Sequence, residues 1–208
     1  MPLLLMDAEY LPPLAFFAFT ARAEAVILDD REPFQKQTSR SRTTILGANG
    51  PLVLSIPLEK GKTKKTAGEV RINNSRDWQR VHWVSIRSAY GKAPFFEHYA
   101  PLIEPFFKER YSGLFEFNFK LIELLAGLMR MPVTFQRNSG LSGEILSKAL
   151  DFRQGSPQYL AEQNMPLREV AYLQVFSQRY GFVPGLSILD LLMNEGPESF
   201  RVLRKMAG

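Results

Sequence analysis

The most constraining feature of this sequence is a strand–helix–strand pattern near its beginning. The apolar runs Leu3–Met6 and Val26–Leu28 have the length and composition of short buried strands. Between them, Pro13 suits the first turn of a helix that we expect to continue to about Ala23. Two buried strands joined by a helix form a βαβ unit, which requires a parallel pair and a right-handed crossover. The pattern therefore predicts an α/β fold whose ligands lie beyond the carboxyl ends of the strands.

Later segments extend this unit. Asn49-Gly50 is a strong turn signal, so residues 43–58 predict a β-hairpin. The run Val133–Phe135 is the candidate last strand of the sheet. Further helices are predicted over Ser142–Asp151, over Ser187–Met193, and after Glu195-Gly196-Pro197 to about Lys205. The predicted fold class is a Rossmann-like, mostly parallel sheet with a β-hairpin and a largely helical C-terminal part.

We expect two regions in the chain. Residues 1–135 form an α/β core domain, and residues 136–208 form a helical C-terminal region packed on that core. The length of 208 residues supports a substantial hydrophobic core. We find no internal repeat.

Composition narrows the functional classes. A net charge of +5 favours anionic partners, although an excess of this size does not by itself indicate nucleic acid. The absence of cysteine excludes disulfides, thiolate nucleophiles and cysteine-ligated zinc. No apolar run is long enough to cross a bilayer, so we expect a soluble, cytoplasmic protein without a membrane span.

Common catalytic and nucleotide motifs are absent. The sequence has no GxGxxG, GxxxxGK[ST], GxSxG or HExxH pattern. Asp29-Asp30 is a candidate for binding Mg²⁺ with a pyrophosphate, or else for capping a turn. With only two histidines in the chain, we name no metal site and no cofactor.

The helix within residues 74–96 gathers aromatic and titratable side chains. At 100° per residue, Trp78, His82, Ile86 and Ala89 share one face, with Trp83 and Tyr90 at its edge. His82 is either a general base, since its unperturbed pKa lies near neutrality, or a buried, hydrogen-bonded structural histidine. If the protein has a polar site, we expect it at this helix.

The segment Phe34–Arg42 is rich in hydrogen-bonding and basic side chains. Arginine guanidinium groups match phosphate and carboxylate oxygens in a bidentate way, which favours an anion site here. The alternative is a solvated basic loop. The βαβ pattern places residues 7–13 and 29–42 on one rim of the sheet, and we expect the arginine run to face His82 across a shared cavity.

Several blocks together resemble the WbqC-like protein family across nearly the whole chain, with the layout of its Bacteroidetes-type branch. They are Tyr10-Leu11-Pro12-Pro13, Phe34–Arg42, Leu46–Gly50, Ile56-Pro57, Trp78 with His82-Trp83, Ala89-Tyr90, Pro94–Phe96, Gln174–Phe176, Gly181-Phe182, Leu186–Leu192 and Asn194–Pro197. The chain departs from the family pattern at two places. Asp7-Ala8-Glu9 stands where many members carry Gln-Pro, and no Asn-Pro-x-Gly-Gly block lies between Met131 and Tyr172.

The resemblance implies a bacterial role in O-antigen or other surface-polysaccharide biosynthesis. We therefore expect a transferase that modifies a nucleotide-activated amino sugar by acyl or aminoacyl transfer. Its candidate catalytic residues are His82 and Tyr90, and its candidate substrate- and anion-binding residues are Tyr10, Lys36, Gln37, Arg40, Arg42 and Trp83.

Two alternatives belong to other classes. A non-catalytic scaffold protein of the same pathway would bind an anion or a sugar nucleotide without a base. A nucleic-acid binder, suggested by charge alone, would require a continuous basic face, and we expect no nucleic-acid partner.

Overall fold

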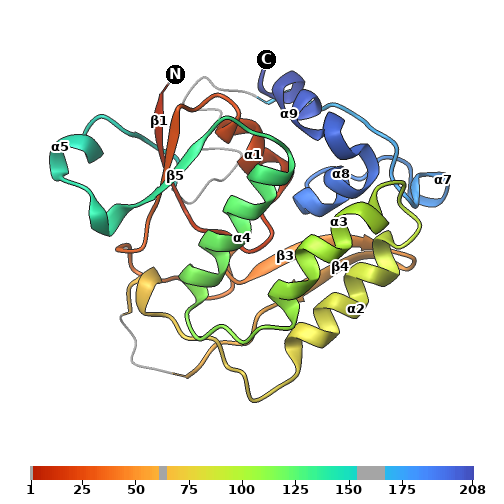
Figure 1. Ribbon diagram of the computed structural model, residues 1–208, viewed down its shortest axis with the longest axis horizontal. Coiled ribbons are helices and arrows are strands. Elements are labelled where there is room, and N and C mark those ends of the chain that lie inside the picture. Colours follow the sequence, from red (N-terminus) through yellow and green to blue (C-terminus); the bar gives the residue numbers. More distant parts are fainter. Residues whose placement is uncertain (1, 61–64, 154–166) are drawn as a thin grey trace.

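The computed structural model describes residues 2–60, 65–153 and 167–208 (Figure 1). Its centre is a four-stranded sheet with the strand order β5-β2-β1-β6, and every neighbouring pair in this sheet is parallel. The strands are β1 (Leu3–Met6), β2 (Ala25–Leu28), β5 (Thr134–Arg137) and β6 (Leu150–Asp151). The predicted α/β fold with a mostly parallel sheet is confirmed.

The strand order reverses at β1. The helix α1 (Leu14–Thr20) leads from β1 to β2 on one side, and β5 continues beyond β2, whereas β6 pairs with β1 on the other side. The carboxyl ends of the neighbouring strands β1 and β6 therefore mark a topological switch point, beyond which ligands bind in open α/β sheets.

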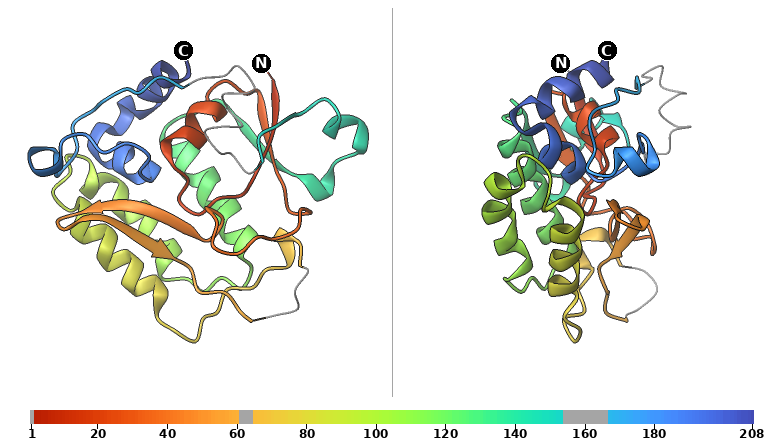
Figure 2. Two further views of the ribbon diagram at one scale, coloured as in Figure 1. Left: turned by 180° about the vertical axis from the view of Figure 1, so that it is seen from behind. Right: turned by 90° about the vertical axis from the view of Figure 1, so that its right-hand side faces the viewer.

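The predicted hairpin is also confirmed. It consists of β3 (Arg42–Gly47) and β4 (Gly50–Ser55), which pair in antiparallel register from Arg42 opposite Ser55 to Gly47 opposite Gly50. Gly50 has a φ of 104°, a conformation that favours glycine and explains the turn signal. In the view from behind, the hairpin lies across the molecule in front of α2 (Figure 2).

Helices cover the sheet and the hairpin. The 13-residue helix α2 (Trp78–Tyr90) buries the predicted face of Trp78, His82, Ile86 and Ala89, and it lies against β3. The further helical segments are η1 (Ala67–Glu69), α3 (Phe96–Ile103), η2 (Glu104–Phe107), α4 (Leu114–Leu128), η3 (Asn138–Gly140), α5 (Gly143–Leu146), α7 (Ser177–Tyr180), α8 (Ile188–Glu195), η4 (Gly196–Glu198) and α9 (Ser199–Ala207). None of the described helices has the length and apolar character needed to cross a bilayer.

One predicted helix is shorter than expected. Residues 142–151 form the short helix α5 and then the strand β6, because Leu150 and Asp151 pair with Leu4 and Leu5 of β1. Hydrogen bonding to an open strand edge overrides the helical pattern of the segment. As a result, β5 is not the last strand of the sheet.

The C-terminal helices pack on the core. Helices α8 and α9 contact α1, and the described residues share one hydrophobic cluster that extends from Leu4 to Leu203. The helical C-terminal part is thus confirmed. The division into domains at residue 135 stays a prediction, and β6 joins the sheet from the C-terminal side of that division.

Candidate functional site

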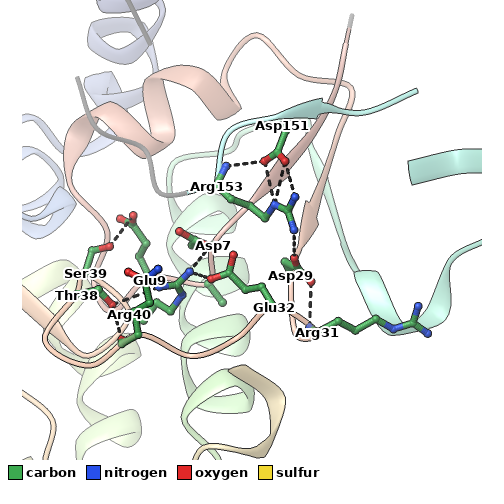
Figure 3. A network of polar contacts seen from close by, with 12 residues as sticks. Asp7, Glu9, Asp29, Arg31, Glu32, Thr38, Ser39, Arg40, Asp151 and Arg153 are labelled. Atoms are coloured by element: carbon green, nitrogen blue, oxygen red, sulfur yellow. Dashed lines mark hydrogen bonds and ion pairs between the residues drawn. The ribbon is translucent and has the colours of Figure 1, made fainter. Parts of the chain in front are cut away.

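Polar side chains converge where the parallel strands end, which we call the carboxyl edge (Figure 3). Asp7 follows β1, Asp29 follows β2, Asn138 follows β5 and Asp151 ends β6. Because parallel strands finish at the same edge, side chains from four distant parts of the chain meet there.

Arg40 is the buried cation of this edge. Its guanidinium group donates to the Asp7 carboxylate at 2.9 Å and also contacts the carboxylate of Glu32. The arginine is only 3% exposed. Both carboxylates belong to segments that follow strands, so Arg40 ties the rim 29–42 to the end of β1.

Arg153 forms a second ion-pair group on the β6 side. It donates to Asp29 Oδ2 at 2.7 Å and pairs with Asp151, while Asn138 Nδ2 donates to Asp29 Oδ1 at 2.6 Å. Burial raises the pKa of Asp151, but hydrogen bonds from Arg153 outweigh it and lower the pKa. The hydrogen bond from Arg31 N to Asp29 Oδ1 shows the turn-capping role that the sequence left open for Asp29.

Glu9 is a carboxyl group at this edge whose acidity is strongly altered. Its Oε1 accepts a hydrogen bond from Ser39 Oγ at 2.8 Å, whereas its Oε2 is buried without a hydrogen-bond partner among the described residues. Burial raises the pKa of Glu9 from 4.5 to about 7, against a hydrogen bond from Ser39 that lowers it. The nearby charge of Asp7 raises it further.

Three hydrogen bonds hold the loop that carries Glu9. Tyr10 N donates to Ser39 O, Asn118 Nδ2 donates to Ala8 O, and Thr43 Oγ1 donates to Leu11 O, at 2.8–2.9 Å. Leu11 adopts a φ of 42°, which is unfavourable for a residue with a Cβ atom. Such strained backbone clusters at functional sites.

Glu9 lines a small cavity at the switch point. The cavity measures about 40 Å³ and is otherwise largely apolar. Its lining residues are Met6, Asp7, Glu9, Pro13, Ala15, Phe16, Phe19 and Phe152. Phe152 directly follows β6, so the cavity joins the ends of β1 and β6. It has room for a water molecule or an amino group, and a larger ligand would extend out from its mouth.

A carboxyl group with a pKa near neutrality in an apolar cavity can give and accept protons at physiological pH. The described residues contain no group of three or more histidine, aspartate or glutamate side chains arranged to hold a metal ion. The Glu9 carboxyl group is suited to proton transfer because its pKa lies near neutrality.

His82 lies away from this cavity, in the aromatic core. It is 4% exposed, its Nδ1 is 2.8 Å from the Tyr10 hydroxyl, and it also hydrogen-bonds to the backbone of Ser55. Its ring contacts those of Tyr10 and Trp78, with centroids 5.7 and 5.1 Å away. Burial lowers the pKa of His82 to about 4. These surroundings match the structural alternative, and a role as general base stays a prediction.

Tyr10, one of the predicted site residues, connects the carboxyl edge with the surroundings of His82. Its backbone hydrogen-bonds to Ser39 on the rim and its hydroxyl contacts His82. The side chain is buried, and burial raises its pKa well above 10. Tyr10 therefore supports the loop from beneath, and direct contact with a substrate stays a prediction.

Tyr90 and Trp83 lie elsewhere on α2. Tyr90 is buried beside Asp190 of α8; burial first, and then the charge of Asp190, raise its pKa well above 10. Trp83 Nε1 donates to Glu104 at 2.9 Å, and its ring stacks on Phe96 and Phe107. The structure does not bring either residue to the carboxyl edge.

The structure places the residues of the predicted basic segment Phe34–Arg42 in different surroundings. Arg40 points into the carboxyl edge and is engaged by two carboxylates, whereas Lys36 and Gln37 are exposed and Arg42 is half-buried in β3. Their joint role in holding a diphosphate stays a prediction. The expected meeting of residues 7–13 and 29–42 on one rim is confirmed by the contacts of Ser39 and Arg40.

Sequence reasoning missed Glu9 and Arg153 as site residues. Glu9 carried a signal, since an acidic residue closely following a buried first strand points to the edge where ligands bind. Arg153 carried none, because its position depends on β6, which the sequence did not predict.

The chain is similar to known proteins over most of its length. The sequence profile of the WbqC-like protein family matches residues 7–202. Uncharacterized protein Rv1507c of Mycobacterium tuberculosis is 22% identical in an alignment 223 positions long, which covers 96% of each chain. No solved structure matches the chain.

Proposed function

Because the chain belongs to the WbqC-like protein family, we propose that it acts in surface-polysaccharide biosynthesis, where it modifies a nucleotide-activated amino sugar by acyl or aminoacyl transfer. The observation that carries the chemistry is the Glu9 carboxyl group, which lines a small cavity at the switch point. Its pKa is raised by burial to about 7, and its Oε2 has no hydrogen-bond partner among the described residues. Family membership supports the pathway, and this cavity supports the reaction type.

The proposed step transfers one proton and one acyl group. The amine nitrogen of the sugar attacks the acyl carbon of the donor and forms the new C–N bond. The bond from that carbon to the donor's leaving group breaks, and the leaving group departs with the electron pair. Glu9 Oε2 accepts the proton that the nitrogen loses. A general base whose pKa lies near the working pH is well suited to this transfer.

The charges around Glu9 favour an amine. Four carboxylates, those of Asp7, Glu32, Asp29 and Asp151, share the two arginines Arg40 and Arg153 (Figure 3). An excess of carboxylates attracts the ammonium form of an amino sugar, which gives one proton to solvent to become the attacking amine before Glu9 accepts the second. The cavity has room for this amino group, and the sugar ring and nucleotide would lie outside its mouth.

The second candidate function is a non-catalytic scaffold protein of the same pathway. The small size of the cavity favours it, since most of a sugar nucleotide would remain outside. The scaffold predicts binding of a sugar nucleotide without turnover.

A direct test combines binding and turnover. The protein is screened by thermal shift against nucleotide-activated amino sugars and their N-acetylated counterparts, and then incubated with acyl-CoA thioesters or free amino acids with ATP. Mass spectrometry detects N-acylated product. We expect product with the wild type, and a rate reduced at least ~100-fold in Glu9→Gln. The control is Glu97→Gln, an exposed carboxylate on α3.

Two results would count against catalysis. Undiminished turnover in Glu9→Gln would remove Glu9 as the base. A sugar nucleotide that stabilises the protein but is never acylated would support the scaffold. The cytoplasmic location, the Bacteroidetes-type branch and the catalytic roles of His82 and Tyr90 stay predictions.

A further inference from the structure

A second cavity opens at the opposite, amino edge of the sheet. It is lined by residues that immediately precede β2 and β5, and by α9, and it measures about 1030 Å³. The start of β1 and the end of α9 lie at this same end of the molecule (Figures 1 and 2). This amino-edge cleft is large enough for a nucleotide-sized ligand, unlike the cavity beside Glu9.

The lining of the cleft is strongly basic. Its charged side chains are Arg22, Arg130, Arg168, Arg201, Arg204 and Lys205, and no aspartate or glutamate of the described residues lines it. Among the described residues, Arg201 pairs with Glu198, and the other five cations form no ion pair. Charges of one sign that gather in a concave surface focus the electrostatic potential and attract anions.

Beneath these cations the cleft has an apolar floor. Ala23, Met129, Met131 and Ala207 are buried there, and Phe200 is half-buried. The cleft can therefore hold an apolar or aromatic group while the arginines bind its charged part. Arginine is suited to the second task because its guanidinium fork matches two phosphate oxygens at once.

Arg130 occupies a position that normally favours glycine. It has a φ of 55° and ends α4 in a Schellman motif, in which Arg130 N donates to Gly127 O and Met131 N donates to Ala126 O. A residue with a Cβ atom is sterically unfavourable in this conformation. The chain thus places a guanidinium group at the cleft against a local conformational cost, and such strain points to function.

We propose that the amino-edge cleft binds an organic diphosphate, with the diphosphate on the arginines and the organic group on the apolar floor. This site is separate from the carboxyl edge, so the proposal does not depend on acyl transfer there. The ligand chemistry has two possible sources, a nucleoside diphosphate or the diphosphate head group of an isoprenoid lipid.

Isothermal titration calorimetry with three probes tests the proposal. The probes are inorganic pyrophosphate, UDP and farnesyl diphosphate, each at 150 and 500 mM NaCl. We expect the organic diphosphates to bind more tightly than pyrophosphate, because they also use the floor, and to bind more weakly at high salt. Tighter binding of UDP identifies a nucleotide site, and tighter binding of farnesyl diphosphate identifies a lipid site.

Arg130→Gly separates binding from folding. Glycine relieves the unfavourable conformation, so we expect the melting temperature to rise by roughly 2–4 °C while the affinity falls about tenfold. Arg204→Gln should weaken binding similarly, and the exposed Arg76→Gln is the matched control. No binding of any probe at 1 mM, or binding unchanged in Arg130→Gly and Arg204→Gln, would overturn the proposal.

Discussion

At the residue scale, burial shifts the pKa values of Glu9 and His82 in opposite directions. The folded-state pKa of Glu9 is raised from 4.5 to about 7, so its contribution to stability is present below pH 4.5 and falls as the pH rises to 7. The pKa of His82 is lowered from 6.5 to about 4, so its contribution is present above pH 6.5 and is lost as the pH falls to 4. The two groups therefore change the stability in opposite directions as the pH rises from 4.5 to 6.5.

Glu9→Gln should expose the cost of ionising this carboxyl group. At pH 8 the wild type carries a buried charge that glutamine lacks, so we expect the variant to have the higher free energy of unfolding, by about 1–3 kcal/mol. The difference should disappear below pH 4.5, where both side chains are neutral. Urea unfolding from pH 4 to pH 8 measures it. Equal stability at pH 8 would mean that Glu9 is ionised without a penalty.

His82→Asn tests the structural role of the histidine. Loss of the contacts with Tyr10 and Ser55 in the core should lower the free energy of unfolding by about 2–4 kcal/mol at pH 7.5 and weaken the loss of stability between pH 6.5 and 4. His98→Asn, on an exposed ring, is the control and should change little. A variant with an unchanged melting temperature and no turnover would instead support His82 as the base.

The sequence could predict the burial of individual residues better than their chemistry. The helical period places Trp78, His82, Ile86 and Ala89 on one buried face, as observed. It cannot show that the hydroxyl of Tyr10, 72 positions earlier, forms a hydrogen bond with the imidazole of His82. It likewise cannot show that Arg40, on a predicted solvent-facing or ligand-facing run, is neutralised by Asp7 and Glu32.

At the element scale, the connection between α8 and α9 has no room for a side chain larger than that of glycine at position 196. Gly196 has a φ of 53°, and a Cβ atom built there would lie 2.5 Å from the ring of Phe95. The sequence predicted a break at Glu195-Gly196-Pro197, which is confirmed, but the aromatic ring that crowds the glycine comes from a segment 101 positions earlier.

Gly196→Ala should therefore destabilise the fold by about 2–4 kcal/mol, because it combines a steric overlap with an unfavourable φ. Gly127→Ala is the matched control, since it sits inside α4 and no atom lies within 4 Å of the place that its new Cβ would take. That control should stabilise the protein by about 0.5–1 kcal/mol. Thermal unfolding of both variants measures the contrast, and equal melting temperatures would contradict the packing at Phe95.

The elements that the sequence identified are those with strong local signals. Asn49-Gly50 and the first βαβ unit are examples. The strand β6 is only two residues long and has no alternating pattern, so its identity comes from the open edge of β1 rather than from its own residues.

At the scale of the whole molecule, the two edges of the sheet differ in charge. At the carboxyl edge four carboxylates share Arg40 and Arg153, and cations line the cleft at the amino edge. The sequence could not show this separation, because the cleft cations are spread from Arg22 to Lys205 and converge only through the fold.

Arg153 connects distant parts of this architecture, since it joins the end of β2 to the end of β6. Replacing it with alanine leaves the buried Asp29, 1% exposed, without its arginine partner. Because the Arg153 side chain is 33% exposed, we expect a moderate loss of about 1–2 kcal/mol in unfolding free energy. Arg31→Ala should cost less, because its hydrogen bond to Asp29 comes from the backbone.

Adding Asp29→Asn to Arg153→Ala should recover part of the loss, since it removes the uncompensated charge. A double variant whose loss equals the sum of the two single losses would show that the two side chains are not coupled. Chemical denaturation of the four proteins completes the cycle.

The pairing of β1 with β6 also has a consequence for synthesis on the ribosome. Once β1 and β2 have emerged, the other edge of β1 has no partner until Leu150 is made, 122 positions after β2 ends at Leu28. At about 5–20 residues per second this interval lasts roughly 6–24 s. Throughout it the nascent chain carries an open apolar strand edge, and we expect chaperones that shield such edges to raise the yield of native protein.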